Sequence, residues 1–235
     1  MTRNWPHWRE ISRLASEPIM TPTPKLSLGL LLTAAAGFMD AIGFIEMGGF
    51  FVSFVSGNTT QLGDALANGI WPVGVLTASL ITMFFLGGVA GSSLALLDRR
   101  WAPSAVLTLV VLAILASLSM AMWGLPPSQA TLALALAAGA QNAILPPEGS
   151  ARLGTTFVTG TMFAAGQDLA KAFWRKAPPW RWAQHLLVWA SLMIGAGIGA
   201  LAYRSLGIYA LVVPVAIYAA FLAAFSLVGP RKVQT

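Results

Sequence analysis

Several apolar runs in this chain are long enough to cross a lipid bilayer, and they constrain its fold more than any other feature. They cover about 27–47, 72–97, 104–123, 129–145, 181–203 and 207–227. A transmembrane helix needs about 20 mostly apolar residues. Only 9% of the residues are charged and the mean hydropathy is +0.72, whereas soluble domains carry about 25% charged residues. The sequence therefore predicts an all-α polytopic membrane protein with one transmembrane helix for each of these runs, six in total.

Two polar segments interrupt this pattern, "FVSFVSGNTTQLGDALANG" at 51–69 and "TTFVTGTMFAAGQDLAKA" at 155–172. The front of the first is β-branched and aromatic, which favours an extended backbone. Ser56-Gly57-Asn58 and Thr159-Gly160-Thr161 then mark a turn and the N-cap of a short helix. We interpret each segment as a re-entrant element with an extended leg, a turn near mid-depth and a short helix. Non-helical backbone at that depth is tolerated only where it is buried in protein or lines a cavity.

The chain contains an internal repeat with an offset of about 103 residues. "AGFMDAIG" at 36–43 aligns with "AGAQNAIL" at 138–145, so that Asp40 meets Asn142 and Gln141 lies beside it. The polar segments, with Asp64 and Asp168 on their short helices, and the later apolar runs align as well. The predicted organisation is a cytoplasmic segment 1–26, membrane repeats 27–123 and 124–228, and a cytoplasmic tail 229–235.

The positions of the positive charges predict the topology. With a cytoplasmic N-terminus and three spans per repeat, Arg204 is the one residue of 14 Lys and Arg that falls outside. If both polar segments cross, Arg99, Arg100 and Arg152 move outside as well. Because Lys and Arg concentrate in cytoplasmic loops, six spans with both termini inside are favoured, and a seven-span variant remains open. An odd number of spans per repeat makes the two repeats inverted, as in many secondary transporters.

The predicted substrate-binding residues are those at the two turns, Ser56, Gly57, Asn58, Thr159, Gly160 and Thr161. Helix N-termini favour anions or carbonyl oxygens, and in inverted repeats the two would face each other near the midplane. The alternative is that both segments are amphipathic helices packed for structural reasons. Asp40 is a candidate for proton coupling, since acids within spans are usually functional. The alternative is an acid bonded to backbone freed at the turn. For Asp64 and Asp168, site and surface positions remain equally open.

Other function classes find little support in the sequence. The net charge is +6, but most Lys and Arg lie at the ends of apolar runs and a few in the polar N-terminus, which argues against a nucleic-acid partner. With no Cys, thiolate catalysis and Cys-ligated metals are excluded. His7 and His185 receive no role, no nucleophile motif is present, and we expect no metal, no cofactor and no enzyme activity. The sequence leaves the oligomeric state open.

The motifs "AGFMDAIGF" (36–44), "FVSGNTTQLG" (54–63) and "FVTGT" (157–161) resemble those of the YoaK-like family of bacterial multi-pass inner-membrane proteins. The resemblance covers 27–228, with Ser56 where a Thr is expected. It implies a multi-pass protein of the bacterial inner membrane and supplies no substrate. We therefore predict a small secondary transporter or exchanger of a small polar or anionic solute. A passive channel on the same fold and a non-transporting membrane scaffold are the alternatives.

Overall fold

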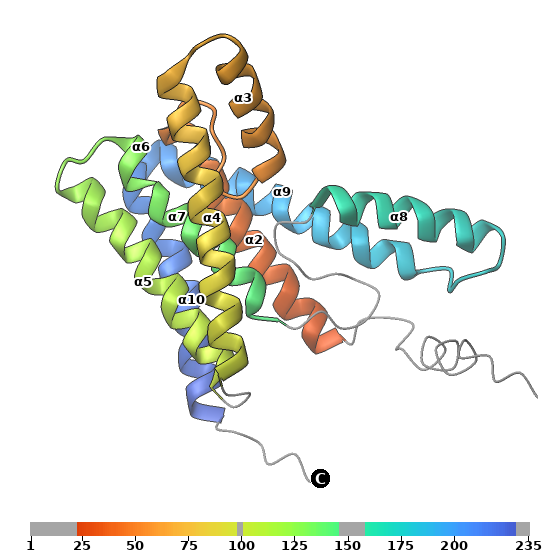
Figure 1. Ribbon diagram of the computed structural model, residues 1–235. Coiled ribbons are helices and arrows are strands. Elements are labelled where there is room, and N and C mark those ends of the chain that lie inside the picture. The colour runs from red at the N-terminus through yellow and green to blue at the C-terminus, as the bar shows by residue number, and fades with distance from the viewer. Residues whose placement is uncertain (1–22, 98–100, 146–157, 229–235) are drawn as a thin grey trace, which may run out of the picture.

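The computed structural model describes residues 23–97, 101–145 and 158–228, and the regular structure within these ranges is entirely helical (Figure 1). The elements are α2 (Thr23–Glu46), α3 (Val55–Ala67), α4 (Trp71–Leu97), α5 (Ala102–Met122), α6 (Pro127–Ala130), α7 (Leu132–Ala140), η1 (Gln141–Ala143), α8 (Val158–Phe173), α9 (Arg181–Leu206), η2 (Gly207–Leu211) and α10 (Val212–Val228). Most of the predicted N-terminal segment, the C-terminal tail, Arg99, Arg100, Arg152 and the predicted extended leg at 155–157 lie outside the described residues.

Four stretches of the described chain are long and apolar enough to cross a membrane. They are Lys25–Glu46, Trp71–Leu97, Ala102–Met122 and Arg181–Ser226. The last is 46 residues long and bends at η2, where Gly207 adopts a φ of 58° that favours glycine. The bend divides this stretch into α9 and α10. Helices at the predicted spans 27–47, 72–97, 104–123, 181–203 and 207–227 are therefore present in the structure, whereas their passage through a membrane as six spans stays a prediction.

The predicted helix over 129–145 was wrong as a single element. Its place is taken by α6, the nine-residue α7 and the 3₁₀ turn η1. Side chains at the two breaks bond to backbone carbonyls: Thr131 Oγ1 donates to Pro127 O at 2.5 Å, and Asn142 Nδ2 donates to Ala138 O at 2.9 Å. Such local bonds compete with a continuous helical ladder. The first helix of the second repeat is accordingly shorter than α2.

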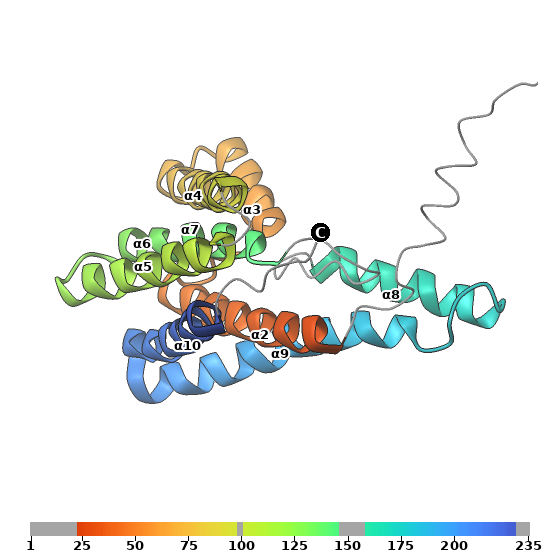
Figure 2. The ribbon, with the colours of Figure 1, turned by 90° about the horizontal axis from the view of Figure 1, so that it is seen from below.

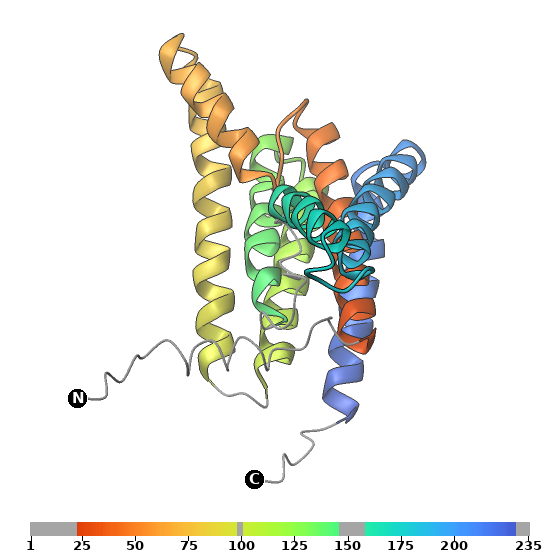
Figure 3. The ribbon, with the colours of Figure 1, turned by 90° about the vertical axis from the view of Figure 1, so that its right-hand side faces the viewer.

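The helices form three layers when the molecule is seen from below (Figure 2). α3 and α4 make one outer layer, α5, α6 and α7 the middle one, and α2, α9 and α10 the other outer layer. The main core lies between α2, α5, α7 and α10 and includes the fully buried Met39, Ile114, Leu134 and Tyr218. α4 stands at the edge of the bundle (Figure 3), so much of its surface remains exposed.

Glycines bring α2 close to α9. A Cβ added to Gly37 would lie 2.2 Å from the carbonyl oxygen of Leu192, and one added to Gly195 would lie 2.0 Å from that of Ala34. Gly199 likewise faces the backbone of Phe38. Small residues at such spacing allow helix backbones to approach closely in membranes.

The α4–α7 pair repeats this arrangement. A Cβ on Gly139 would lie 2.0 Å from the carbonyl oxygen of Phe84, and one on Gly87 would lie 2.1 Å from that of Leu136. Gly91 faces Ala140 in the same way. Each glycine aligns with its counterpart in the other half of the sequence. The first helix of each half therefore packs against the second long helix of the other half, as an internal duplication predicts.

Both polar segments supply the short arm of a helical hairpin. α3 folds back along the first part of α4, and α8 folds back along the first part of α9 (Figure 1). With 13 and 16 residues, these helices are shorter than the run of about 20 residues that a bilayer requires. The prediction of a short helix in each segment is confirmed for the described residues.

Candidate functional site

The extended leg before α3, residues 50–54, is held in place by two side chains of the first half of the chain. Asp40, near the end of α2, accepts hydrogen bonds at Oδ1 from the backbone N–H groups of Val52 and Ser53, each at 2.9 Å. Asn58 pairs with Phe51, whose N–H donates to Asn58 Oδ1 at 3.2 Å and whose carbonyl accepts from Asn58 Nδ2 at 2.6 Å. Backbone that leaves a helix within a membrane needs partners of this kind, because lipid offers none.

Asp40 thus makes the contacts that the structural alternative expected from the sequence: an acid that is hydrogen-bonded to backbone freed at the turn. Its carboxylate is partly buried and fixes the leg that leads into α3. The role of Asp40 as a proton carrier is not tested by these contacts and stays a prediction. A group that holds the leg can also change the leg when it gains a proton, so the two roles are compatible.

The predicted cap of α3 by a hydroxyl at the turn was wrong, while the residues that precede α8 lie outside the described ones. α3 begins at Val55, directly after Phe54, and has no side-chain capping bond. Ser56 therefore lies inside the first turn of α3, and Thr159 lies inside α8. For α3 the physical reason is the leg: Asp40 and Asn58 fix the backbone up to residue 53, and the chain becomes helical as soon as those bonds end.

A groove of about 860 Å³ lies where the leg, α4 and the first turns of α3 and α8 meet. Its hydroxyl groups belong to Ser53, Ser56, Ser92, Ser93 and Thr159. Aromatic and aliphatic side chains, chiefly from α4, form the rest of the wall together with Gly88 and Gly160. The volume lies within the range of roughly 300–1,000 Å³ that is typical of small-molecule sites.

Three of the six predicted turn residues line this groove: Ser56, Thr159 and Gly160. The other three do not line it. A Cβ added to Gly57 would meet ring atoms of Phe54 at 2.4 Å, while Asn58 and Thr161 are buried. Gly57 and Gly160 therefore differ in their surroundings, because a Cβ on Gly160 would meet nothing within 4 Å.

The remaining predicted polar residues are not among those that line the groove. Gln141 is buried in the core, where its Oε1 accepts a hydrogen bond from the hydroxyl of Tyr218. Asn142 bonds to backbone at the end of α7. Asp64 is exposed on α3 and accepts a hydrogen bond from Asn68 at 2.9 Å.

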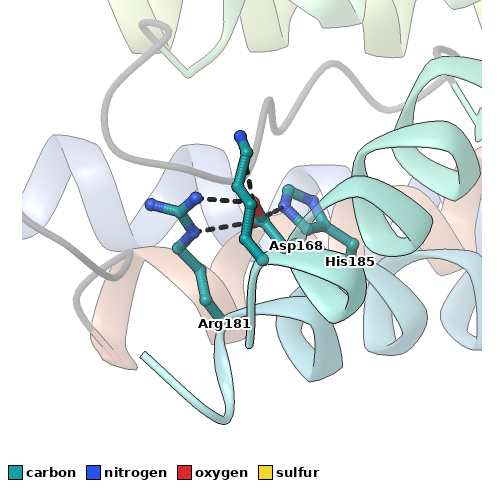
Figure 4. Close-up of polar contacts among 4 residues, drawn as sticks. Asp168, Arg181 and His185 are labelled. Atoms are coloured by element: carbon teal, nitrogen blue, oxygen red, sulfur yellow. Dashed lines mark hydrogen bonds and ion pairs between the residues drawn. The ribbon is translucent and has the colours of Figure 1, made fainter. Parts of the chain in front are cut away.

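Asp168, by contrast, is buried in the α8–α9 hairpin as the centre of a charged cluster (Figure 4). Arg181 donates from Nε to Asp168 Oδ2 at 2.7 Å and from Nη2 to Oδ1 at 2.5 Å. Nε2 of His185 lies 3.2 Å from Oδ2, and Nζ of Lys171 lies 3.9 Å from Oδ1. The cluster fastens α8 to the start of α9.

Burial alone would raise the pKa of Asp168, but the hydrogen bonds and charge of Arg181, with a smaller contribution from His185, outweigh it and hold the pKa below its ordinary value. Arg181 and His185 were not predicted as partners of Asp168. Their i, i+4 spacing places them on one face of a helix, and that spacing was the available signal. Within the described ranges, no group of three or more acidic or histidine side chains is arranged to hold a metal ion.

Comparison with known proteins places the chain among membrane proteins. Residues 28–224 match the family described as "Protein of unknown function (DUF1275)". The chain belongs to this family. It is also similar to the UPF0700 transmembrane protein RA0705 of Rhizobium meliloti (strain 1021), with 35% identity over 214 residues. That alignment covers 89% of this chain and 91% of the relative. No solved structure matches the chain significantly.

The DUF1275 match begins within α2 and ends within α10, so it includes the leg, both hairpins and the groove. The relative is a transmembrane protein by its printed name, and the described part of this chain has four stretches of membrane-spanning length. This member of the DUF1275 family is therefore an integral membrane protein.

Proposed function

We propose that this chain is a small secondary transporter of the bacterial inner membrane whose solute site is the groove between the leg, α4 and α8. The observation that carries the proposal is the meeting of the two polar segments at one groove. Ser56 comes from the first segment, and Thr159 and Gly160 come from the second. Binding at the interface of two repeats is the usual arrangement in transporters built from inverted repeats.

The topology that belongs to this proposal has six spans, two inverted repeats and cytoplasmic termini. It is supported by the distribution of Lys and Arg and by the matching glycine contacts of α2 with α9 and of α4 with α7. The short helices α3 and α8 then enter the membrane from opposite sides without crossing it. Transport rather than catalysis is proposed because the described residues that line the groove supply hydroxyls and apolar groups and include no nucleophile–base pair.

A flux assay in proteoliposomes tests the proposal. The purified chain is reconstituted, and uptake of a panel of labelled small solutes, both neutral and anionic, is measured over a range of concentrations. We expect saturable uptake of at least one solute, which separates a carrier from a passive channel. Gly160→Val, which places two methyl groups in the groove, abolishes that uptake. Gly166→Val is the matched control, because Gly166 lies on the same helix, has open space around its Cβ and does not line the groove.

Two results would contradict the proposal. The first is the absence of flux for every solute with well-folded protein, which favours a membrane scaffold. The second is flux that Gly160→Val and Gly166→Val leave equally intact, since the solute would then pass elsewhere.

A further inference from the structure

The chemistry of the groove bears on which solute it takes. Among its described lining residues there is no Asp, Glu, Lys, Arg or His. The polar side chains of this lining are Ser53, Ser56, Ser92, Ser93 and Thr159, and that of Ser53 is also hydrogen-bonded to Asp40. A hydroxyl can donate and accept a hydrogen bond, so it suits a carbonyl, ester, amide or hydroxyl group. A carboxylate or phosphate in the same place would lose water without gaining a counter-charge, which is costly.

The apolar wall of the groove is a stripe on one face of α4. Ile81, Phe85, Val89 and Leu96 recur at helical spacing along it. The stripe covers fifteen residue steps, or about 22 Å at a rise of about 1.5 Å per residue. A site of this length and volume is far larger than a small inorganic or organic anion requires.

Several of the α4 side chains that line the groove are exposed at the surface of the described structure. Side chains of Phe85, Val89 and Leu96 are 66%, 48% and 85% exposed. α4 is one of the stretches of membrane-spanning length, so in a bilayer these exposed apolar side chains contact acyl chains. A molecule with an apolar body can therefore reach the groove sideways from the membrane.

We infer that the groove takes an uncharged amphipathic molecule, with an apolar chain along α4 and a hydroxyl, ester or amide group at the serines and Thr159. This inference rests on the proposed transport function, because it names the solute class for the same site. It narrows the class predicted from the sequence, which included anions on the ground of helix N-termini alone. The partial positive charge of a helix N-terminus is about half a unit, and no cationic side chain of the described lining adds to it.

The test uses the full chain in lipid nanodiscs and a monoacylglycerol that carries a photoreactive diazirine in its acyl chain. After illumination, labelled peptides are mapped by mass spectrometry, and unlabelled competitors are added in parallel. Monoolein has the uncharged head and the chain, oleate at alkaline pH has a comparable chain with a negative charge, and glycerol has the head alone. We expect labelling within residues 81–96 and competition by monoolein at about tenfold lower concentration than oleate, which corresponds to about 1.4 kcal/mol. Glycerol should not compete.

Two variants show whether the label reports the groove. Gly88 lines it and an added Cβ meets nothing within 4 Å, so Gly88→Phe fills the groove without a backbone clash at Cβ. Gly63 on α3 has the same open space and lies outside the groove, so Gly63→Phe is the control. We expect Gly88→Phe to reduce labelling about tenfold, or about 1.4 kcal/mol, because the phenyl ring occupies the space of the ligand, while Gly63→Phe labels like the wild type. Gly160→Val serves as a second filling variant if Gly88→Phe fails to fold.

Stronger competition by oleate than by monoolein, equal competition by glycerol, or labelling that the filling variants leave unchanged would overturn the inference. The result is separable from the proposed function. Specific labelling of the groove without flux in proteoliposomes would support the inferred ligand class and contradict the proposed transport function. Saturable flux of an anion that depends on the groove would support the proposed transport function and contradict the inference of an uncharged ligand.

Discussion

Ser56 and Thr159 line the same groove although they lie 103 residues apart in the chain. Each belongs to the first turn of a short helix that folds back on a long one. The sequence places them at corresponding positions of a duplicated pattern, and the structure brings these positions together against α4. The account of function depends on this meeting, and the predictions below address the contacts that support it.

Loss of the Asp40 carboxylate should destabilise the leg before α3. In Asp40→Ala the N–H groups of Val52 and Ser53 lose their acceptor, and each unpaired buried donor costs about 1–3 kcal/mol. Asp40→Asn keeps an acceptor oxygen and should remain close to the wild type. Thermal unfolding in detergent measures the difference. Equal stability of the two variants would show that these hydrogen bonds do not hold the leg.

If Asp40 also carries a proton, Asp40→Asn should retain solute exchange and lose uptake driven by a pH gradient. An amide cannot gain and release a proton in the physiological range, whereas it can still accept the two backbone hydrogen bonds. The two activities are compared in the same proteoliposomes. Full pH-driven uptake by a well-folded Asp40→Asn protein would remove the proton-carrier role and leave the structural one.

The close contact of α2 with α9 should tolerate no added methyl group at Gly195. The Cβ of Gly195→Ala would lie 2.0 Å from the carbonyl oxygen of Ala34, so the helices must separate. We expect a loss of about 1–3 kcal/mol, the usual cost of overpacking. Gly197→Ala is the control two residues away, since its Cβ meets nothing within 4 Å. A Gly195→Ala protein as stable as Gly197→Ala would argue against this packing.

Asp168 and Asp64 occupy corresponding helices and should respond differently to the same change. Asp168→Asn leaves Arg181 without its bidentate partner, and we expect a cost of about 2 kcal/mol, below the range for fully buried pairs because Arg181 is partly exposed. Asp64 is exposed, so Asp64→Asn should change stability by less than about 0.5 kcal/mol. Equal effects in unfolding experiments would contradict the role assigned to the Asp168 cluster.

The contribution of Asp168 should also depend on pH. Its pKa in the folded protein lies below the ordinary value of 3.8, so the unfolded chain binds the proton more readily. The stabilisation is complete above pH 3.8 and is lost as the pH falls through the lower, folded value. The difference in stability between wild type and Asp168→Asn should therefore shrink in this acidic range. A difference in stability that grows as the pH falls would contradict a lowered pKa of Asp168 in the folded protein.

Much of the helical order could be predicted because apolar length and charge position are local properties of the chain. The same holds for the duplicated "AG" motifs, whose Gly37 and Gly139 make corresponding contacts. The break at Thr131 was missed because a hydrogen bond from its side chain to one backbone carbonyl does not change the hydropathy of the sequence. The Asp168 cluster was missed because Arg181 looked like a charge at the end of an apolar run. Whether it faces water or a carboxylate depends on how α8 folds back.

Chemical crosslinking of the two polar segments tests the central claim most directly. The chain has no Cys, so Ser56→Cys/Thr159→Cys carries the only two thiols, and a bismaleimide that reaches about 20 Å, two helix diameters, can join them. After proteolysis between the segments, we predict that the two fragments stay linked. The Asn68→Cys/Thr159→Cys pair should be linked far less efficiently, because Asn68 lies about 18 Å farther along α3 than Ser56. Absence of a link between residues 56 and 159, with both thiols reactive, would contradict a shared groove.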